Sequence, residues 1–183
     1  AELDWLQQLP VAEMIKRGWI SAGADPVDRM RASLSFFGVA SPAQWQEHWA
    51  NPQVSYRQSR SFESQHHALA VWLRQGEILA QQIVCKPYDS NAFRAVLNDA
   101  RRLTTVEPEI FVKSLQAACA AVGVAVVFVP EAAGARVSGA TRWLNPYKAL
   151  IQLSLRYKTD DQLWFSFFHE AGHILLHGKR DVF

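Results

Sequence analysis

The sequence predicts helices before Gly123 and strands after it, and this change restricts the folds that the chain can adopt. Up to residue 122 the sequence carries the start and stop signals of helices. The segments "DPVDRMRASLSFFG" and "SPAQWQEHWANP" each place a proline at a first helical position and stop at glycine or before proline. After Gly123, "VAVVFVP" is a β-branched run bounded by glycine and proline, which suits a buried strand. We therefore expect an α+β fold, with a helical lobe over residues 1–122 followed, over residues 123–183, by a small β-sheet and a final helix.

Further helices are predicted within the helical lobe. "LPVAEMIKRG" begins at Pro10 and stops at Gly18, and apolar residues at helical spacing predict one long amphipathic helix over residues 62–84, despite Gly76. "DSNAFRAVLNDARRL" and "PEIFVKSLQAACAAVG" add two helices, the second closed by Gly123. Several tryptophans of the lobe could form an interface, but core packing is the favoured role. These are Trp5, Trp19, Trp45, Trp49 and Trp72.

Two more strands are predicted after "VAVVFVP". "SGATRWL" and "KALIQLSLRY" are separated by the turn-forming "NPYK". In the second segment, Ile151 and Leu153 alternate with Gln152 and Ser154, which is typical of a strand with one buried face. The sheet is thus expected to expose one side of this strand.

The final predicted helix carries most of the chemistry. Thr159, followed three residues later by Gln162, fits a capping box at its start, and Gly178 is a natural stop. Six polar residues of the helix share a sector roughly 100° wide, while the remaining positions from Trp164 to Leu176 are apolar or small. This polar stripe consists of Gln162, Ser166, His169, Glu170, His173 and His177.

His169, Glu170 and His173 form the motif His-Glu-x-x-His. The two histidines lie about 40° apart on one face of the helix and about 6 Å apart along its axis, so both imidazoles can converge on one Zn²⁺ ion. Glu170 falls to one side, where it could hydrogen-bond a metal-bound water and act as general base. Two surface histidines, or a structural bundle with an accidental motif, are the simpler alternatives.

A catalytic zinc needs three protein ligands and an open position. His177 is about 12 Å from His169 along the axis, so a role beside the metal or toward the substrate suits it better than ligation. We expect the third ligand to lie beyond Phe183, in which case this segment alone can be metal-free and inactive. Arg142, Tyr147 and His177 are candidates to stabilise an oxyanion, although each is more often a surface or packing residue.

The run "LSLRYKTDDQLWFSFFHEAGHILLHGKRDVF" resembles the signature helix and preceding strand of the ImmA/IrrE family of zinc metallopeptidase domains. The upstream segments "AVWLRQGE", "FRAVLNDARRLT" and "VSGATRWL" are similar to longer members, in which this domain follows a helix-turn-helix of the XRE or HigA-antitoxin type. The resemblance implies a zincin-like active-site helix, with His169 and His173 as zinc ligands and Glu170 as the catalytic acid/base. It places the third ligand, a glutamate, on a later helix.

The resemblance also implies a biological setting. It suggests a zinc-dependent endopeptidase domain of a bacterial, cytoplasmic transcriptional regulator or antitoxin, acting on a protein partner such as a repressor or toxin. DNA would be bound only through a domain before Ala1, because a formal charge of +2 gives no electrostatic case for nucleic acid. No apolar run is long enough for a membrane span. A non-catalytic regulatory or antitoxin module that uses the same fold for sensing or protein binding is the rival hypothesis, and a homodimer stays open.

Overall fold

The computed structural model describes residues 2–50, 63–101, 108–132, 137–154 and 160–177. The chain divides into two compact units, one of Ala1–Gln75 with Glu131–Arg136 and one of Gly76–Pro130 with Val137–Phe183. The division does not coincide with the boundary expected at residue 122. Helices α6 (Ser90–Ala100) and α7 (Pro108–Ala120) belong with the sheet rather than with the first helices, because their apolar residues pack on the strands.

The first unit is helical, as predicted. It contains α1 (Glu2–Gln8), α2 (Val11–Lys16), α3 (Pro26–Phe37), α4 (Pro42–Trp45), the π-helical turn η1 (Gln46–Ala50) and the first part of α5 (Glu63–Gln82). The expected signals set the bounds of α3: the Asp25 carboxylate accepts the amide of Asp28, and Gly38 ends the helix with a φ of 71°. A glycine adopts this left-handed conformation without strain.

Aromatic side chains form the core of the first unit. Trp5 and Phe37 lie 6.3 Å apart between ring centroids, and Trp45 is 5.8 Å from Trp5. Trp45 and Trp72 are fully buried. Core packing is therefore confirmed for Trp5, Trp45 and Trp72. Trp19, by contrast, is half-buried beneath the guanidinium of Arg17.

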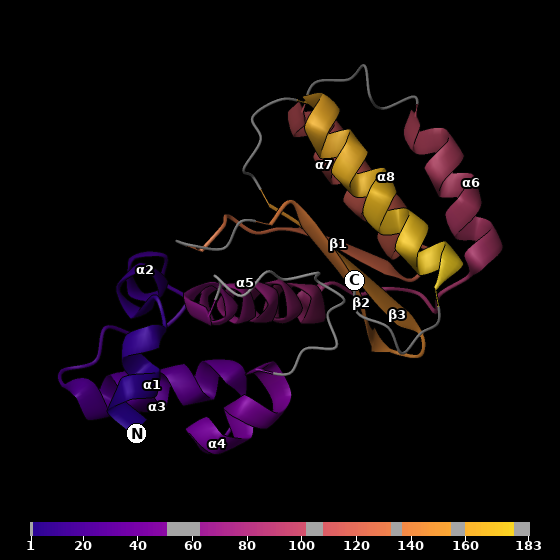
Figure 1. Ribbon diagram of the computed structural model, residues 1–183. Coiled ribbons are helices and arrows are strands. Elements are labelled where there is room, and N and C mark those ends of the chain that lie inside the picture. Colours follow the sequence, from indigo (N-terminus) through magenta and orange to yellow (C-terminus); the bar gives the residue numbers. More distant parts are fainter. Residues whose placement is uncertain (1, 51–62, 102–107, 133–136, 155–159, 178–183) are drawn as a thin grey trace. The chain divides into compact units, whose positions relative to one another are not determined.

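The second unit is built on a three-stranded sheet with the order β1-β3-β2. Strand β1 (Val124–Phe128) pairs parallel to β3 (Lys148–Leu153), and β2 (Gly139–Asn145) pairs antiparallel to β3. Helices α6 (Ser90–Ala100), α7 (Pro108–Ala120) and α8 (Asp160–Leu176) lie on one face of this sheet (Figure 1). The α+β fold class is thus confirmed, and the helix with the histidines packs on the sheet as expected.

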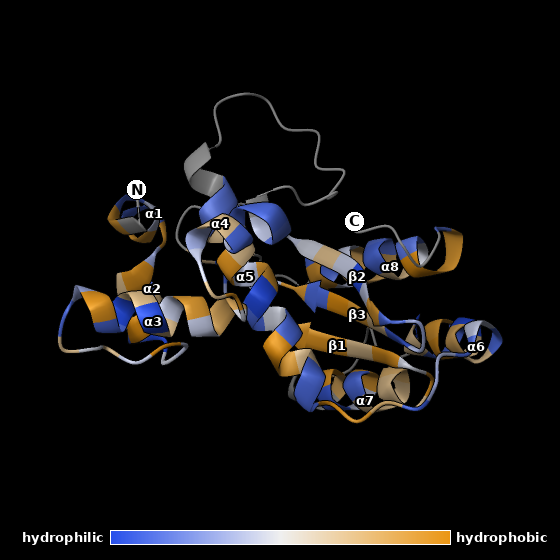
Figure 2. Ribbon diagram, turned by 90° about the horizontal axis from the view of Figure 1, so that it is seen from below, coloured by the Kyte–Doolittle hydropathy of each residue, from blue (hydrophilic) through white to orange (hydrophobic). Residues whose placement is uncertain are grey.

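The two faces of the sheet differ in character. Figure 2 shows β1 in the colours of apolar residues along its whole length, because both of its faces are covered. Helix α8 carries both polar and apolar residues. Side chains that point toward α6, α7 and α8 form the core of the second unit with Phe93, Phe111, Phe167 and Ile174. The opposite face carries Gln152, which contacts Gly76 in the last turns of α5.

The expectation that β3 exposes one side is wrong. Gln152 and Ser154 are both buried, with exposed fractions of 1% and 6%. Strand β3 is central in the sheet, and its second face is covered by α5 from Gly76 onward. Lys148, on that face, donates its Nζ to the carbonyls of Ala80 and Ile83 at the end of α5. Leu155 and Tyr157, which the same pattern included, lie outside the described residues.

Candidate metal centre

Three histidines follow one another along one side of α8, and the last of them, His177, is the residue just past its end. The rings of His169 and His173 lie 4.8 Å apart between centroids and nearly perpendicular, and those of His173 and His177 lie 5.2 Å apart. Because four residues advance a helix by slightly more than one turn, each imidazole lies above the one before it. His169 and His177 are exposed, and His173 is half-buried.

The first two histidines have the geometry of a metal-binding pair. The Nε2 atoms of His169 and His173 are 3.2 Å apart. Two nitrogens bound at ~2.0–2.1 Å to one tetrahedral zinc ion lie about 3.3 Å from each other. The same distance also suits a hydrogen bond between one protonated and one unprotonated ring nitrogen. The residues present thus fit two ligand positions of a zinc site, with no rearrangement of α8.

Glu170 points away from solvent, toward β2. Its side chain is only 6% exposed, and Oε2 lies 2.8 Å from Oγ1 of Thr141. The same hydroxyl lies 3.1 Å from the backbone carbonyl oxygen of Glu170. Gly139 leaves space for the carboxyl group, because a Cβ there would lie 2.8 Å from Cγ and 3.0 Å from Oε1 of Glu170. Two residues of β2 therefore hold the central carboxyl of the motif.

Burial changes the protonation behaviour of this site. The loss of solvation raises the pKa of Glu170 to about 7, and the hydrogen bond from Thr141 opposes this shift. Partial burial lowers the pKa of His173, and the positive charges of His169 and His177 lower it further. Near neutral pH the centre therefore combines a carboxyl group poised between its two forms with a neutral imidazole.

Strand β2 is an edge strand of the described sheet, since it pairs with β3 on one side only. Thr141 and Gly139 face α8, and the alternation of a strand turns Ala140 and Arg142 to the other face. The backbone edge of β2 thus runs next to the carboxyl of Glu170.

The structure places two of the three oxyanion candidates, Arg142 and Tyr147, apart from the histidine pair. Arg142 lies on the α5 side of the sheet, where its guanidinium forms an ion pair of 3.0 Å with Glu77. Tyr147 is 67% exposed in the turn between β2 and β3, six residues along the chain from the Thr141 that contacts Glu170. Of the three oxyanion candidates, only His177 adjoins the pair.

Other potential ligands are not gathered here. Among residues 2–50, 63–101, 108–132, 137–154 and 160–177, no group of three histidine, cysteine, aspartate or glutamate side chains is arranged to hold a metal ion. Asp181, the one carboxylate that follows His173 in the sequence, lies outside those ranges, as do the predicted cap Thr159 and the predicted helix stop Gly178. His67 of the first unit has a different role, because its ring stacks on Trp45 at 4.6 Å within the core.

Sequence reasoning identified the two histidines and Glu170 but missed Thr141 and Gly139. The hydroxyl that contacts Glu170 comes from 29 residues earlier in the chain. Neither residue type is a metal ligand or a common catalytic group, so only the pairing of strand and helix shows their importance.

In the described part of the chain, no helix has the length and apolar character needed to cross a membrane. Comparison with protein-family models, with curated proteins and with solved structures found no match.

Proposed function

We propose that this chain is a zinc-dependent endopeptidase domain that hydrolyses a peptide bond in a protein partner. One observation carries the proposal: the Nε2 atoms of His169 and His173 lie at the separation of two ligands of one zinc ion, and the buried Glu170 follows the first of them. A pair of histidines beside a carboxyl group of shifted pKa supplies two of the three ligands of a catalytic zinc and a candidate general base.

His169 and His173 would hold the metal, which would act as a Lewis acid toward water and the scissile carbonyl. Glu170 would accept the proton of the attacking water and later deliver it to the leaving amine. A pKa near neutrality suits both steps, and burial raises the pKa of this carboxyl to about 7 in the metal-free chain.

Thr141 is suited to position Glu170 in both of its protonation states. Toward the carboxylate, the hydroxyl can donate its hydrogen across the 2.8 Å to Oε2. When Glu170 is protonated, it can donate to Oγ1 instead, and Thr141 can turn its hydrogen to the carbonyl oxygen 3.1 Å away. Glu170 can thus gain or lose a proton while every buried polar group of the pair keeps a hydrogen-bond partner.

The edge of β2 is the proposed site of the substrate backbone. An extended peptide can add to such an edge through main-chain hydrogen bonds that do not depend on its sequence. Because Gly139 and Thr141 contact Glu170, a peptide aligned on β2 would pass close to the carboxyl group.

The wider setting follows from the resemblance to the ImmA/IrrE family and is part of the same proposal. The partner would be a repressor or toxin, and the chain would belong to a zincin-like domain of a bacterial transcriptional regulator or antitoxin. DNA contact would be the task of a separate helix-turn-helix domain. The third zinc ligand would be a glutamate outside the described residues.

A non-catalytic regulatory or antitoxin module is the second candidate. One observation favours it: Arg142, which could have stabilised an oxyanion, is paired with Glu77 on the opposite face of the sheet. In that case the histidine pair would sense metal or contribute to a protein-binding surface.

A peptide mixture prepared from a digested proteome separates the two candidates. The zinc-loaded protein that includes the proposed third ligand is incubated with the mixture, and new peptide termini are identified by mass spectrometry. The proposal predicts new termini with the wild-type chain, none with Glu170→Gln, and retained zinc in that variant. Glu77→Gln is the matched control, because the same chemical change on the other face of the sheet should leave cleavage intact.

Gly139→Ala sharpens the test. Its added Cβ would approach Cγ of Glu170 to 2.8 Å and displace the carboxyl, so cleavage should fall while zinc stays bound. Wild-type cleavage that is no greater than that of Glu170→Gln would reject the enzyme in favour of the regulatory module.

A further inference from the structure

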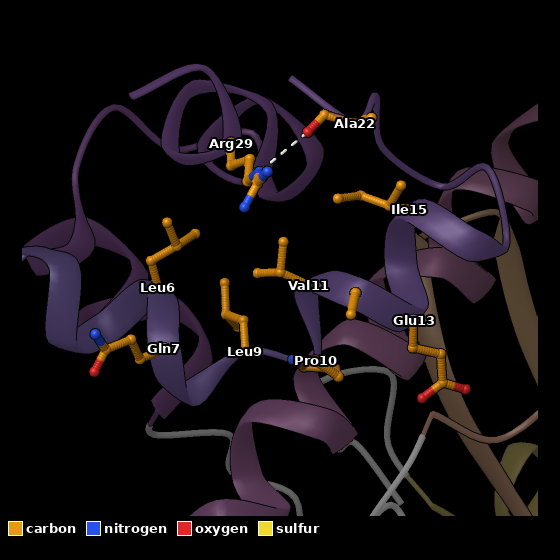
Figure 3. A pocket seen from close by; sticks show the side chains of 10 residues that line it. Leu6, Gln7, Leu9, Pro10, Val11, Glu13, Ile15, Ala22 and Arg29 are labelled. Atoms are coloured by element: carbon orange, nitrogen blue, oxygen red, sulfur yellow. Dashed lines mark hydrogen bonds between the residues drawn. The ribbon is translucent and has the colours of Figure 1, made fainter. Parts of the chain in front are cut away.

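The first unit contains an apolar pocket of about 820 Å³ between α1, α2 and α3 (Figure 3). Its wall is mostly aliphatic and is contributed by Leu6, Leu9, Val11 and Ile15, with Arg29 and Ala22 on the side of α3. This volume lies within the ~300–1,000 Å³ that is usual for small-molecule sites.

Two local features of the chain create the pocket. Pro10 separates α1 from α2. A hydrogen bond of 2.8 Å from the Val11 amide to the Leu9 carbonyl closes a tight turn of the backbone there. On the other side, Gly23 has a φ of 61°, and a Cβ there would meet Asp28 Cβ at 2.9 Å. The glycine thus lets the loop approach α3, where Arg29 Nε donates to the Ala22 carbonyl at 3.2 Å.

One cation lines the pocket, the solvent-exposed Arg29. Glu13 also lines the wall, but its carboxylate forms an ion pair with Arg17. Within the described residues, no acidic side chain pairs with Arg29, whose one side-chain hydrogen bond is the contact to Ala22. Figure 3 shows the far end of this guanidinium turned into the pocket, toward the aliphatic side chains.

We propose that this pocket binds an unbranched aliphatic carboxylate, with the carboxylate on Arg29 and the alkyl chain along Leu6, Leu9, Val11 and Ile15. A guanidinium offers paired donors that match the two oxygens of a carboxylate. The aliphatic wall offers few hydrogen-bonding groups, so a peptide would bury its amides without partners, whereas an alkyl chain has none to satisfy. The inference is independent of the metallopeptidase proposal, because the pocket lies entirely in the first unit.

The test is calorimetric titration of the chain with octanoate, decanoate and the uncharged decanol. Saturable binding of one decanoate per chain is expected. Affinity should rise by up to about fourfold for each methylene that becomes fully buried. Decanol should bind about two- to fivefold more weakly than decanoate, because it cannot form the charged pair and solvent screens the exposed Arg29.

Two variants and one control locate the site. Arg29→Gln should remove the preference for decanoate over decanol, and Val11→Trp should abolish binding of both by filling the pocket. Arg31→Gln is the matched control, because Arg31 is a largely exposed residue of the same helix that pairs with Asp28. It should bind decanoate as the wild type does.

Three results would overturn the proposal. These are no saturable binding of decanoate, equal affinity of the wild type for decanoate and decanol, or decanoate binding that survives both Arg29→Gln and Val11→Trp. Circular dichroism of each variant establishes that any loss of binding occurs in a folded chain.

Discussion

Replacing Glu170 by glutamine in the metal-free chain should alter how stability depends on pH. In the folded chain, burial holds the pKa of this carboxyl at about 7, whereas the unfolded chain has its ordinary value of 4.5. Below pH 4.5 both states are protonated, and Glu170 imposes no penalty. Between these values the unfolded chain releases the proton while the folded chain keeps it, so stability declines as pH rises through 7.

The size of the effect follows from the difference between the two pKa values. Each pKa unit corresponds to about 1.4 kcal/mol, so a shift from 4.5 to about 7 amounts to about 3 kcal/mol. Glutamine has nearly the same shape and does not titrate. The stability of Glu170→Gln relative to the wild type should therefore increase by up to about 3 kcal/mol between pH 4.5 and pH 8.

The assay is urea unfolding with a chelator present, at several pH values from 4.5 to 8. Unfolding is followed through the amide signals of β1 and β3, which report the second unit alone. The histidines of α8 are present in both proteins, so their contribution cancels in the difference. In Thr141→Val the decline in stability should continue to higher pH, because the variant lacks the hydrogen bond that lowers the pKa of Glu170. If the free energy of unfolding depends on pH in the same way for the wild type and for Glu170→Gln, Glu170 is not a buried carboxyl that titrates in this range.

Three further substitutions have defined outcomes. Gly76→Ala would place a Cβ 1.9 Å from Oε1 of the buried Gln152, so it should destabilise the chain by about 1–3 kcal/mol in urea unfolding. Gly172→Ala is the contrasting helical glycine, because its Cβ would meet nothing within 4 Å; it should stabilise the chain by about 0.5–1 kcal/mol in the same assay. His177→Ala removes a positive charge that lowers the pKa of His173, so an NMR titration of the His173 ring should show that pKa raised. An unchanged or lowered value would contradict the proximity of the two rings.

Much of the fold could be predicted because its signals are local. The Ser41 hydroxyl accepts the amide of Gln44 at the start of α4, and Gly38 ends α3 as its position suggested. The long helix across Gly76 was also foreseen, but its reason was not. A side chain at residue 76 would collide with Gln152, which follows 76 positions later and is brought there only by the sheet.

The order of the strands could not be predicted from the pattern of any one of them. Gln152 and Ser154 alternate with apolar residues, and such alternation usually indicates a solvated face. Because β3 lies between β1 and β2 and α5 covers its second face, both polar side chains are buried. The position of a strand within a sheet depends on pairing with distant segments, which the local pattern does not record.

The candidate site was predicted as one polar stripe, and the structure divides that stripe in two. His169 faces solvent, whereas Glu170, one residue later, turns 100° around the helix toward Thr141. Helical spacing is enough to bring His169 and His173 together, because their contact lies within α8. The environment of Glu170 depends on β2, and its shifted pKa could not be foreseen without that strand.

Zinc binding by a set of histidine variants tests the central claim most directly. The protein that includes the proposed third ligand is titrated with zinc, the metal bound per chain is measured by competition with a chromophoric chelator, and the imidazole NMR signals identify the ligands. The account predicts one zinc per chain, affinity at least about tenfold weaker in His169→Ala and in His173→Ala, and little change in His177→Ala. Zinc binding that is equally strong in wild type, His169→Ala and His173→Ala, or that is absent from all of them, would contradict it.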